Sequence, residues 1–271
     1  MSPILAALCG PFLVCGTPTM AFDLDRAAFF DAVRRQPFSG HLTQSQVNGM
    51  SAILDACPAD LGVEKTAYCL ATTFHETART MQPIEEFGRG KGRKYGPTGF
   101  WGRGYVQLTW EANYAKATKR LRALGFLKAS EDLVKTPALA MRPDVAAAIM
   151  FYGMVEGWFT GKKLADYFGP GRTDAVGARR IINGTDCDKL IAGYQVQVRA
   201  ALLVSVRVPD PAPPPKAPDP LTPMTGSVEP APSSPPKLPS QPALGGPSSA
   251  PSPAEPGFWS RIHIFLSRKA A

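Results

Sequence analysis

The sequence contains little cysteine and histidine, which limits the kinds of site it can build. Only five cysteines occur among 271 residues. Those outside a leader-like stretch at residues 1–21 are Cys57, Cys69 and Cys187. An odd number of cysteines does not indicate a disulfide framework, so we expect reduced thiols. The histidines are His41, His75 and His263. They lie far apart without the spacing of metal ligands, and we predict no metal site.

Long alternating strand patterns and nucleic-acid modules are also missing. We find no zinc-finger spacing and no interleaving of aromatic and basic residues, so no nucleic-acid partner is expected. The chain is nevertheless basic, with a formal net charge of +8. Residues 1–208 hold 25 Lys and Arg against 18 Asp and Glu, a net charge of +7. A surface of this sign attracts an anionic polymer.

Composition divides the chain into one globular domain and its appendages. Residues 22–208 are long enough, at about 185 residues, to bury a sizeable core. Residues 209–257 hold 18 of the 28 prolines and indicate a disordered or polyproline linker. Residues 258–271 form an apolar and basic tail that is too short to cross a bilayer. Weak contact of this tail with a membrane surface, docking on a partner and a disordered end all stay open.

The first 21 residues allow two interpretations. Residues 3–16 are apolar and residues 19–21 approximate a signal-peptidase site, but no Lys or Arg precedes them. Alternatively Met20 is the true start, because Asp23-Leu24-Asp25-Arg26 opens a convincing first helix. We favour Met20. The protein is then cytoplasmic until its release to the cell wall, whereas a signal peptide would make it secreted.

Apolar periodicity predicts a mainly α fold. Helices are expected over residues 24–35, 43–56, 62–81, 110–123, 143–158, 173–182 and 187–205. Thr43 and Gln46 have the spacing of a capping box at the start of the second. Residues 95–108 leave room for a small β-hairpin.

Two glutamates stand on either side of a predicted helix end. Apolar residues at helical spacing place Glu76 on a helix with one buried face. Pro83 biases Gln82 away from helical geometry, so the helix ends at or before Gln82. Glu85 then lies in a turn or loop, and the break lets the chain fold back toward Glu76.

Paired carboxyl groups in one cleft are typical of glycoside hydrolysis. One carboxyl must be protonated to release the leaving oxygen, while the other must be ionised to activate water. Burial beside Phe74 would raise the pKa of Glu76, which favours the acid role. The alternative is that Glu76 is an ordinary solvated helix charge, as most glutamates are.

A glycine-rich turn and short polar side chains follow the glutamates. Gly102 and Gly104 allow close backbone approach or positive φ. Gln107, Thr109 and Asn113 supply amide and hydroxyl groups suited to the hydroxyl and N-acetyl groups of a sugar. The alternative for Thr109 is that it only caps the helix that follows.

These strings together resemble the family 19 glycoside hydrolases, the chitinase class. The resemblance rests on His75-Glu76-Thr77, Gly102-Arg103-Gly104, Gln107-Leu108-Thr109, Asn113-Tyr114 and Ile181-Ile182-Asn183-Gly184, in that order, and covers about residues 22–206. It implies a two-lobed, lysozyme-like, mainly α fold with a substrate cleft and at most a small β-hairpin. It also implies inverting hydrolysis of β-1,4 links between N-acetylated sugars, without cofactor or metal.

The resemblance also assigns roles to individual residues. Glu76 would be the general acid. The general base falls on Glu85 in the compact endolysin-like branch of the family, with Glu86 as the fallback. Thr109 would help to hold the attacking water, and the substrate-binding residues would be Gln107, Asn113 and Asn183. An inverting site needs its two carboxyl groups roughly 6.5 to 9.5 Å apart.

Departures from the plant pattern of the family point to a wall-lysing enzyme. The long loop between the two acids is missing, and a Lys/Arg-rich stretch at 88–94 fills the space. This stretch is either a solvated loop or a contact with the anionic bacterial envelope. We therefore predict a monomeric endolysin or cell-wall hydrolase acting on peptidoglycan. The alternatives are a chitinase acting on chitin oligomers and a non-catalytic cell-wall sugar-binding module.

Overall fold

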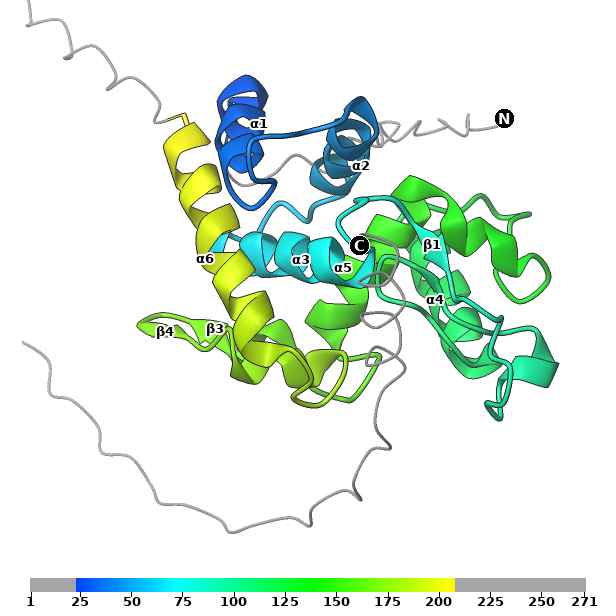
Figure 1. Cartoon of the computed structure of the whole chain (residues 1–271). Helices are drawn as coiled ribbons and strands as arrows, with labels where there is room; N and C mark the ends of the chain where they lie inside the picture. The colour runs from blue at the N-terminus through cyan, green and yellow to red at the C-terminus, as the bar shows by residue number, and fades with distance from the viewer. Residues whose placement is uncertain (1–22, 208–271) are drawn as a thin grey trace, which may run out of the picture. The chain divides into compact units, whose positions relative to one another are not determined.

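The computed structural model describes residues 23–207 (Figure 1). Its α-helices are α1 (Arg26–Arg35), α2 (Gln44–Asp55), α3 (Val63–Glu76), α4 (Glu111–Ala123), α5 (Pro143–Glu156) and α6 (Asp188–Ser205). Its 3-10 helices are η1 (Gly96–Thr98), η2 (Pro137–Met141), η3 (Leu164–Asp166) and η4 (Gly177–Ile181). The predictions for the leader, the proline-rich linker and the tail lie outside the described residues. Among the helices of residues 23–207, none is long and apolar enough to span a membrane.

The predicted mainly α class is confirmed, with two small sheets in place of the single hairpin. β1 (Ile84–Glu85) pairs antiparallel with β2 (Arg103–Gly104), which places Glu85 opposite Arg103. β3 (Phe168–Gly169) pairs with β4 (Arg172–Thr173). The hairpin for which residues 95–108 leave room is reduced to a minimum, because β2 takes its partner strand from before this segment. Only a single bridge, between Arg103 and Leu108, forms inside it.

The core is built around α3 and α5. Nearly every residue of α3 from Thr66 to Glu76 is buried, and the helix packs along α6, which also covers α1. In Figure 1, α6 runs on one side of α3, while α4 and β1 lie on the other. α5 is apolar on all its faces and contacts α2, α4 and β2, as expected for a helix that is buried all round. Its central position joins the segment that carries Glu76 to the segment that carries Glu85.

Helix α3 ends at Glu76, five residues earlier than the predicted span of 62–81. Ala78 adopts a left-handed φ of 51°, and the Arg79 N–H donates to the Phe74 carbonyl at 2.8 Å. This pattern is a Schellman termination formed without glycine. The Thr77 hydroxyl secures it, donating to the Thr73 carbonyl at 2.7 Å and accepting from the Met81 N–H at 3.1 Å. Glu76 is consequently the last helical residue.

The other predicted helices differ less from the structure. The segment 173–182 is not an α-helix but contains the 3-10 helix η4, before which the Asp174 carboxylate accepts the Gly177 N–H at 2.7 Å. The capping box of Thr43 and Gln46 is confirmed, with hydrogen bonds of 2.8 and 3.3 Å.

The three cysteines of the described part of the chain are free thiols, as predicted.

We predict that Gly49→Ala strongly destabilises the fold. A Cβ at this position in α2 would lie 1.8 Å from the carbonyl oxygen of Met81, where the chain turns after α3. Backbone must move to relieve such a clash, so we expect the free energy of unfolding to fall by about 3 kcal/mol. Urea denaturation measures this change. Gly193→Ala in α6 is the matched control: its Cβ meets nothing within 4 Å, and a gain of up to about 1 kcal/mol is expected. Equal stability of the two variants would contradict the packing of Met81 on α2.

Candidate active site

Glu76 is buried at the end of α3 against a buried arginine. The Glu76 side chain is 1% exposed and that of Arg179, in η4, is 0% exposed. The Arg179 guanidinium donates from Nη1 to Glu76 Oε1 and from Nε to the Asp186 carbonyl at 2.8 Å. The ion pair thus joins α3 to η4 and to the segment that leads into α6.

Burial raises the pKa of Glu76, although the charge and the hydrogen bond of Arg179 act in the opposite direction. The charge of Asp186 raises it further. Three polar atoms of this cluster are buried without a hydrogen-bond partner: Glu76 Oε2, Arg179 Nη2 and Asp186 Oδ2. Oε2 can hold and deliver a proton, since no other group of the described chain uses it. Because the carboxyl is enclosed, a ligand reaches it only after neighbouring side chains shift.

Asn183 lies beside this cluster. Its backbone N–H donates to the Arg179 carbonyl at 3.0 Å, just after η4 ends at Ile181. The side chain is partly exposed. Asn183 is therefore close in the chain and in space to the arginine that holds Glu76.

Glu85 lies in a very different environment. Its side chain is 33% exposed in β1, and Arg103, opposite it in β2, donates from Nε to Glu85 Oε1 at 3.2 Å. The indole N–H of Trp101 donates to the same oxygen at 2.7 Å, and Arg89 donates to Oε2 at 3.3 Å. Three donors, two on Oε1 and one on Oε2, fix the orientation of the carboxylate.

These donors favour the ionised form of Glu85. Partial burial acts to raise its pKa, but the Trp101 hydrogen bond and the charges of Arg103 and Arg89 outweigh it and hold the pKa below its ordinary value. Glu76 and Glu85 are thus shifted in opposite directions. Such a pair of carboxyl groups is suited to general acid and general base roles.

Arg103 holds the Glu85 region together. Its guanidinium is almost fully buried, stacks over the Trp101 ring at 4.4 Å and donates to the Gly99 carbonyl and the Tyr114 hydroxyl, both at 3.0 Å. Arg103 therefore connects β2, the preceding turn and α4 to the carboxylate of Glu85.

Gln107 is hydrogen-bonded to β1 and β2 through its side-chain amide nitrogen. Its Nε2 donates to the Ile84 carbonyl at 3.0 Å and to the Gly104 carbonyl at 3.2 Å, while its Oε1 is buried without a partner. Gly102 makes this packing possible, because a Cβ there would lie 2.7 Å from Gln107 Oε1. Of the two polar atoms of the Gln107 side chain, only the acceptor Oε1 is therefore left for a ligand.

Thr109 and Asn113 lie together at the start of α4. The Asn113 side-chain amide donates to the Thr109 carbonyl at 3.0 Å. The alternative that Thr109 caps this helix is wrong: the N-cap is Trp110, at φ 68°, with no side-chain cap. Within residues 23–207 the Thr109 hydroxyl makes no hydrogen bond, so it is free to bind water.

Glu86, the fallback for the base, has a different environment from Glu85. It is 4% exposed, and its two carboxylate oxygens accept from the Tyr95 hydroxyl at 3.0 Å and the Gly102 N–H at 2.9 Å. With both oxygens occupied, it ties the turn before β2 to the segment after β1.

The predicted residues thus fall into two groups. Glu76 and Asn183 meet at Arg179, whereas Glu85, Gln107, Thr109 and Asn113 lie around β1, β2 and the start of α4. Across the described residues, no hydrogen bond or ion pair joins a member of the first group to a member of the second. This separation is compatible with the proposed roles of Glu76 and Glu85, because carboxyl groups that act on opposite faces of a sugar do not contact each other.

Sequence reasoning gave no role to Arg179, Trp101 or Arg103. Arg103 stands inside the recognised glycine-rich string, and Arg179 comes two residues before Ile181. In the sequence, only their positions next to these motifs indicated that they could belong to the site. A buried arginine and an exposed one look the same in a sequence, because burial is decided by the packing around them.

Comparisons with known proteins give a weak similarity to chitinases. No protein-family model matches the chain, and no curated protein matches it either. Among solved structures, the chain is similar to a bacterial family 19 chitinase at 21% identity and a TM-score of 0.42, over 66% of this chain and 94% of that one. It is also similar to chitinase C from Streptomyces griseus HUT6037 at 20% identity and a TM-score of 0.43, over 74% of this chain and 81% of that one. Similarities of this size do not assign the chain to a family.

Among residues 23–207, no group of three or more His, Cys, Asp or Glu side chains is placed to hold a metal ion.

Proposed function

We propose that the protein is an inverting glycoside hydrolase that cleaves β-1,4 bonds in N-acetylated glycans. The observation that carries the proposal is the contrast between two carboxyl groups. Glu76 is enclosed with Oε2 unpartnered, which raises its pKa, whereas Glu85 accepts hydrogen bonds from Trp101 and Arg103, which lower its pKa. General acid and base roles need one carboxyl that keeps its proton and one that has lost it.

In the proposed reaction Glu76 protonates the glycosidic oxygen from Oε2. Glu85 takes a proton from a water molecule that attacks the anomeric carbon from the opposite face, so the configuration inverts. The free hydroxyl of Thr109 orients this water. Arg179 positions Glu76, and Trp101 and Arg103 position Glu85. Gln107, Asn113 and Asn183 would bind the sugar on either side of the cleaved bond.

We infer that the natural substrate is peptidoglycan, cut by an endolysin or cell-wall enzyme with the lysozyme-like fold and the cleft that the motifs imply. The net charge of +7 supports this choice, because peptidoglycan carries carboxylates and chitin does not. Chitin oligomers are the alternative substrate, and they would use the same residues.

One observation favours a second function. Glu76 is enclosed and ion-paired to Arg179, as a purely structural carboxylate would be. A non-catalytic module that binds wall sugars would show this arrangement and would bind glycans without cutting them.

Reducing-end release by the purified protein, on peptidoglycan and on N-acetylglucosamine oligomers side by side, tests these functions. Release from peptidoglycan supports the wall hydrolase, release from the oligomers alone supports the chitinase, and binding without release supports the module. NMR of the first product anomer tests inversion. A first product of retained configuration would refute the roles given to Glu76 and Glu85.

We predict a bell-shaped dependence of kcat/KM on pH. The ordinary pKa of both carboxyls is 4.5. The acid limb lies below this value, because Glu85 must be ionised and its pKa is lowered. The alkaline limb lies above it, because Glu76 must be protonated and its pKa is raised. Initial rates from about pH 3 to about pH 9 measure both limbs. A profile with both limbs on the same side of pH 4.5 would contradict the assignment.

A further inference from the structure

The excess of positive over negative charge in the described chain lies in one segment. From Glu85 in β1 to Arg142 before α5 there are 12 Lys and Arg against 5 Asp and Glu. The rest of residues 23–207 holds 13 of each. The whole excess of +7 therefore lies in the segment that carries Glu85, Gln107 and Thr109.

Lysines rather than arginines supply the uncompensated charge of this segment. Arginines such as Arg120, Arg122 and Arg142 are ion-paired to neighbouring carboxylates. The six lysines of the segment are Lys91, Lys94, Lys116, Lys119, Lys128 and Lys135. All six are exposed, and none forms an ion pair within the described part of the chain.

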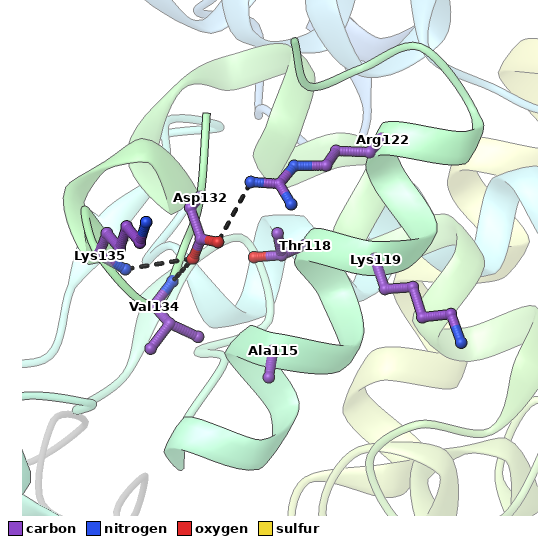
Figure 2. Close-up of a pocket in the computed structure, with 7 residues that line it drawn as sticks. All are labelled: Ala115, Thr118, Lys119, Arg122, Asp132, Val134 and Lys135. Atoms are coloured by element: carbon purple, nitrogen blue, oxygen red, sulfur yellow. Dashed lines mark hydrogen bonds and ion pairs between the residues drawn. The ribbon is translucent and has the colours of Figure 1, made fainter. Parts of the chain in front are cut away.

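Two of these lysines line a hollow beside α4. Lys119 and Lys135 stand at a hollow of about 380 Å³ that also contacts Thr118 and Arg122 (Figure 2). The single acid there, Asp132, is already satisfied: Oδ2 accepts from Arg122 at 3.1 Å, and Oδ1 accepts the backbone N–H groups of Val134 and Lys135 at 2.8 and 3.2 Å. Arg122 and Asp132 cancel each other, so the two lysines set the sign of the hollow.

A second hollow adjoins the first and contains an exposed tryptophan. It has a volume of about 480 Å³ and is lined by Thr98, Trp110, Glu111 and Ala112, and it shares Ala115 with the first hollow. The one acid of this lining, Glu111, places a negative charge at the tryptophan end of the hollows, so the positive charge is concentrated at Lys119 and Lys135. The Trp110 side chain is 46% exposed, and its ring is held by an edge contact with Tyr95 at 5.4 Å. A fixed, exposed indole offers an apolar face to a sugar ring. Trp110 directly follows Thr109, so the second hollow begins next to the proposed water site.

We propose that the two hollows form one trough over α4 that binds a glycan carrying several carboxylates, with a sugar on Trp110, one carboxylate near Lys119 and another near Lys135. The inference extends the proposed function, since it assigns the peptidoglycan strand a second contact beyond the reacting bond. Such a contact separates peptidoglycan from neutral chitin, because only the charged strand gains from the lysines.

Co-sedimentation with purified peptidoglycan sacculi tests the trough independently of catalysis. The full chain carries Glu85→Gln, so that the strand is not cut, and it is compared with the same protein bearing Lys119→Gln and Lys135→Gln. We expect the lysine variant to bind about tenfold more weakly at low ionic strength, and the difference to shrink at high salt. Sacculi whose carboxylates have been converted to neutral amides provide the matched ligand, and both proteins should bind these equally.

Two further variants test whether binding depends on the trough itself or only on the overall positive charge of the protein. Lys162→Gln with Lys189→Gln removes two exposed lysines outside the basic segment, and binding should stay within twofold. Trp110→Ala should weaken binding to native sacculi, amidated sacculi and chitin alike, and Trp110→Phe should restore part of it. Circular dichroism checks that each variant is folded.

The proposal is overturned if the Lys119/Lys135 variant binds native sacculi as well as its parent does. Equal losses in the Lys162/Lys189 variant, or an equal loss of binding to anionic lipid vesicles, would also overturn it, because the effect would then be non-specific or membrane-directed. If charge-dependent binding is found but the wild-type protein releases no reducing ends, the proposed hydrolase function is refuted and the proposed glycan-binding trough is supported.

Discussion

Replacing Glu76 by Gln is expected to lower hydrolysis by about 10²- to 10⁴-fold, the range for removal of a general acid. Gln keeps the shape of the side chain, and its amide oxygen can still accept the Arg179 hydrogen bond. Its amide group then occupies the position of Oε2, which is unpartnered in the wild-type protein, and this group has no acidic proton to give. Because the substrate contacts stay in place, the loss should appear in kcat more than in KM. Reducing-end release on the preferred glycan measures both constants.

The control for this substitution lies on the same helix. Glu64, in the first turn of α3, is also paired to an arginine, Arg199, and Glu64→Gln should leave turnover within twofold. Circular dichroism and thermal unfolding establish that both variants are folded. If folded Glu76→Gln retains turnover, the acid role of Glu76 is excluded, and if folded Glu64→Gln loses it as well, the effect is structural rather than catalytic.

The helical part of the fold was predictable because its signals are local. The apolar spacing along α3, the capping box at Thr43 and the Asp25 cap of α1 each act within a few residues. The end of α3 was not predictable in the same way. Pro83 sets only the latest possible end of the helix, whereas α3 already stops at Glu76 in the Schellman turn of Ala78 and Arg79. The Met81 carbonyl that follows this turn packs on Gly49 of α2, a contact that depends on a residue far away in the chain.

The environment of the two glutamates was predictable only in outline. Apolar spacing predicted that Glu76 is on a helix, which is confirmed. Glu85 lies beyond the helix end as predicted, but in the short strand β1 rather than in a turn or loop, because residues 84–85 pair with residues 103–104. The strands β1 and β2 have two residues each, too few for an alternating pattern to be recognised. The donors that orient Glu85, Trp101 and Arg103, reach it only through this pairing. The partner of Glu76, Arg179, comes from a 3-10 helix that follows it by more than half the length of the domain.

Arg179→Met is expected to cost about 3–5 kcal/mol of unfolding free energy at neutral pH, the range for removing one member of a buried ion pair. Methionine fills much of the volume of the arginine but supplies no charge, so Glu76 is left enclosed without its cation. The neighbouring Arg180 is exposed, and Arg180→Met should change stability by less than about 0.5 kcal/mol. Urea unfolding of the two variants and the wild type compares them under the same conditions.

The cost of Arg179→Met should also depend on pH in a direction fixed by Glu76. The folded-state pKa of Glu76 is already above its ordinary value of 4.5, and Arg179 is the group that lowers it. Without Arg179 the pKa rises further, so the carboxyl keeps its proton to a higher pH. Stability from a raised carboxyl pKa is present below the unfolded value and is lost as pH rises through the folded value. The stability difference from wild type should therefore be small below pH 4.5 and grow above it, and any residual hydrolysis should show an alkaline limb displaced upward. A pH-independent difference with an unmoved limb would mean that Arg179 serves packing alone and does not tune Glu76.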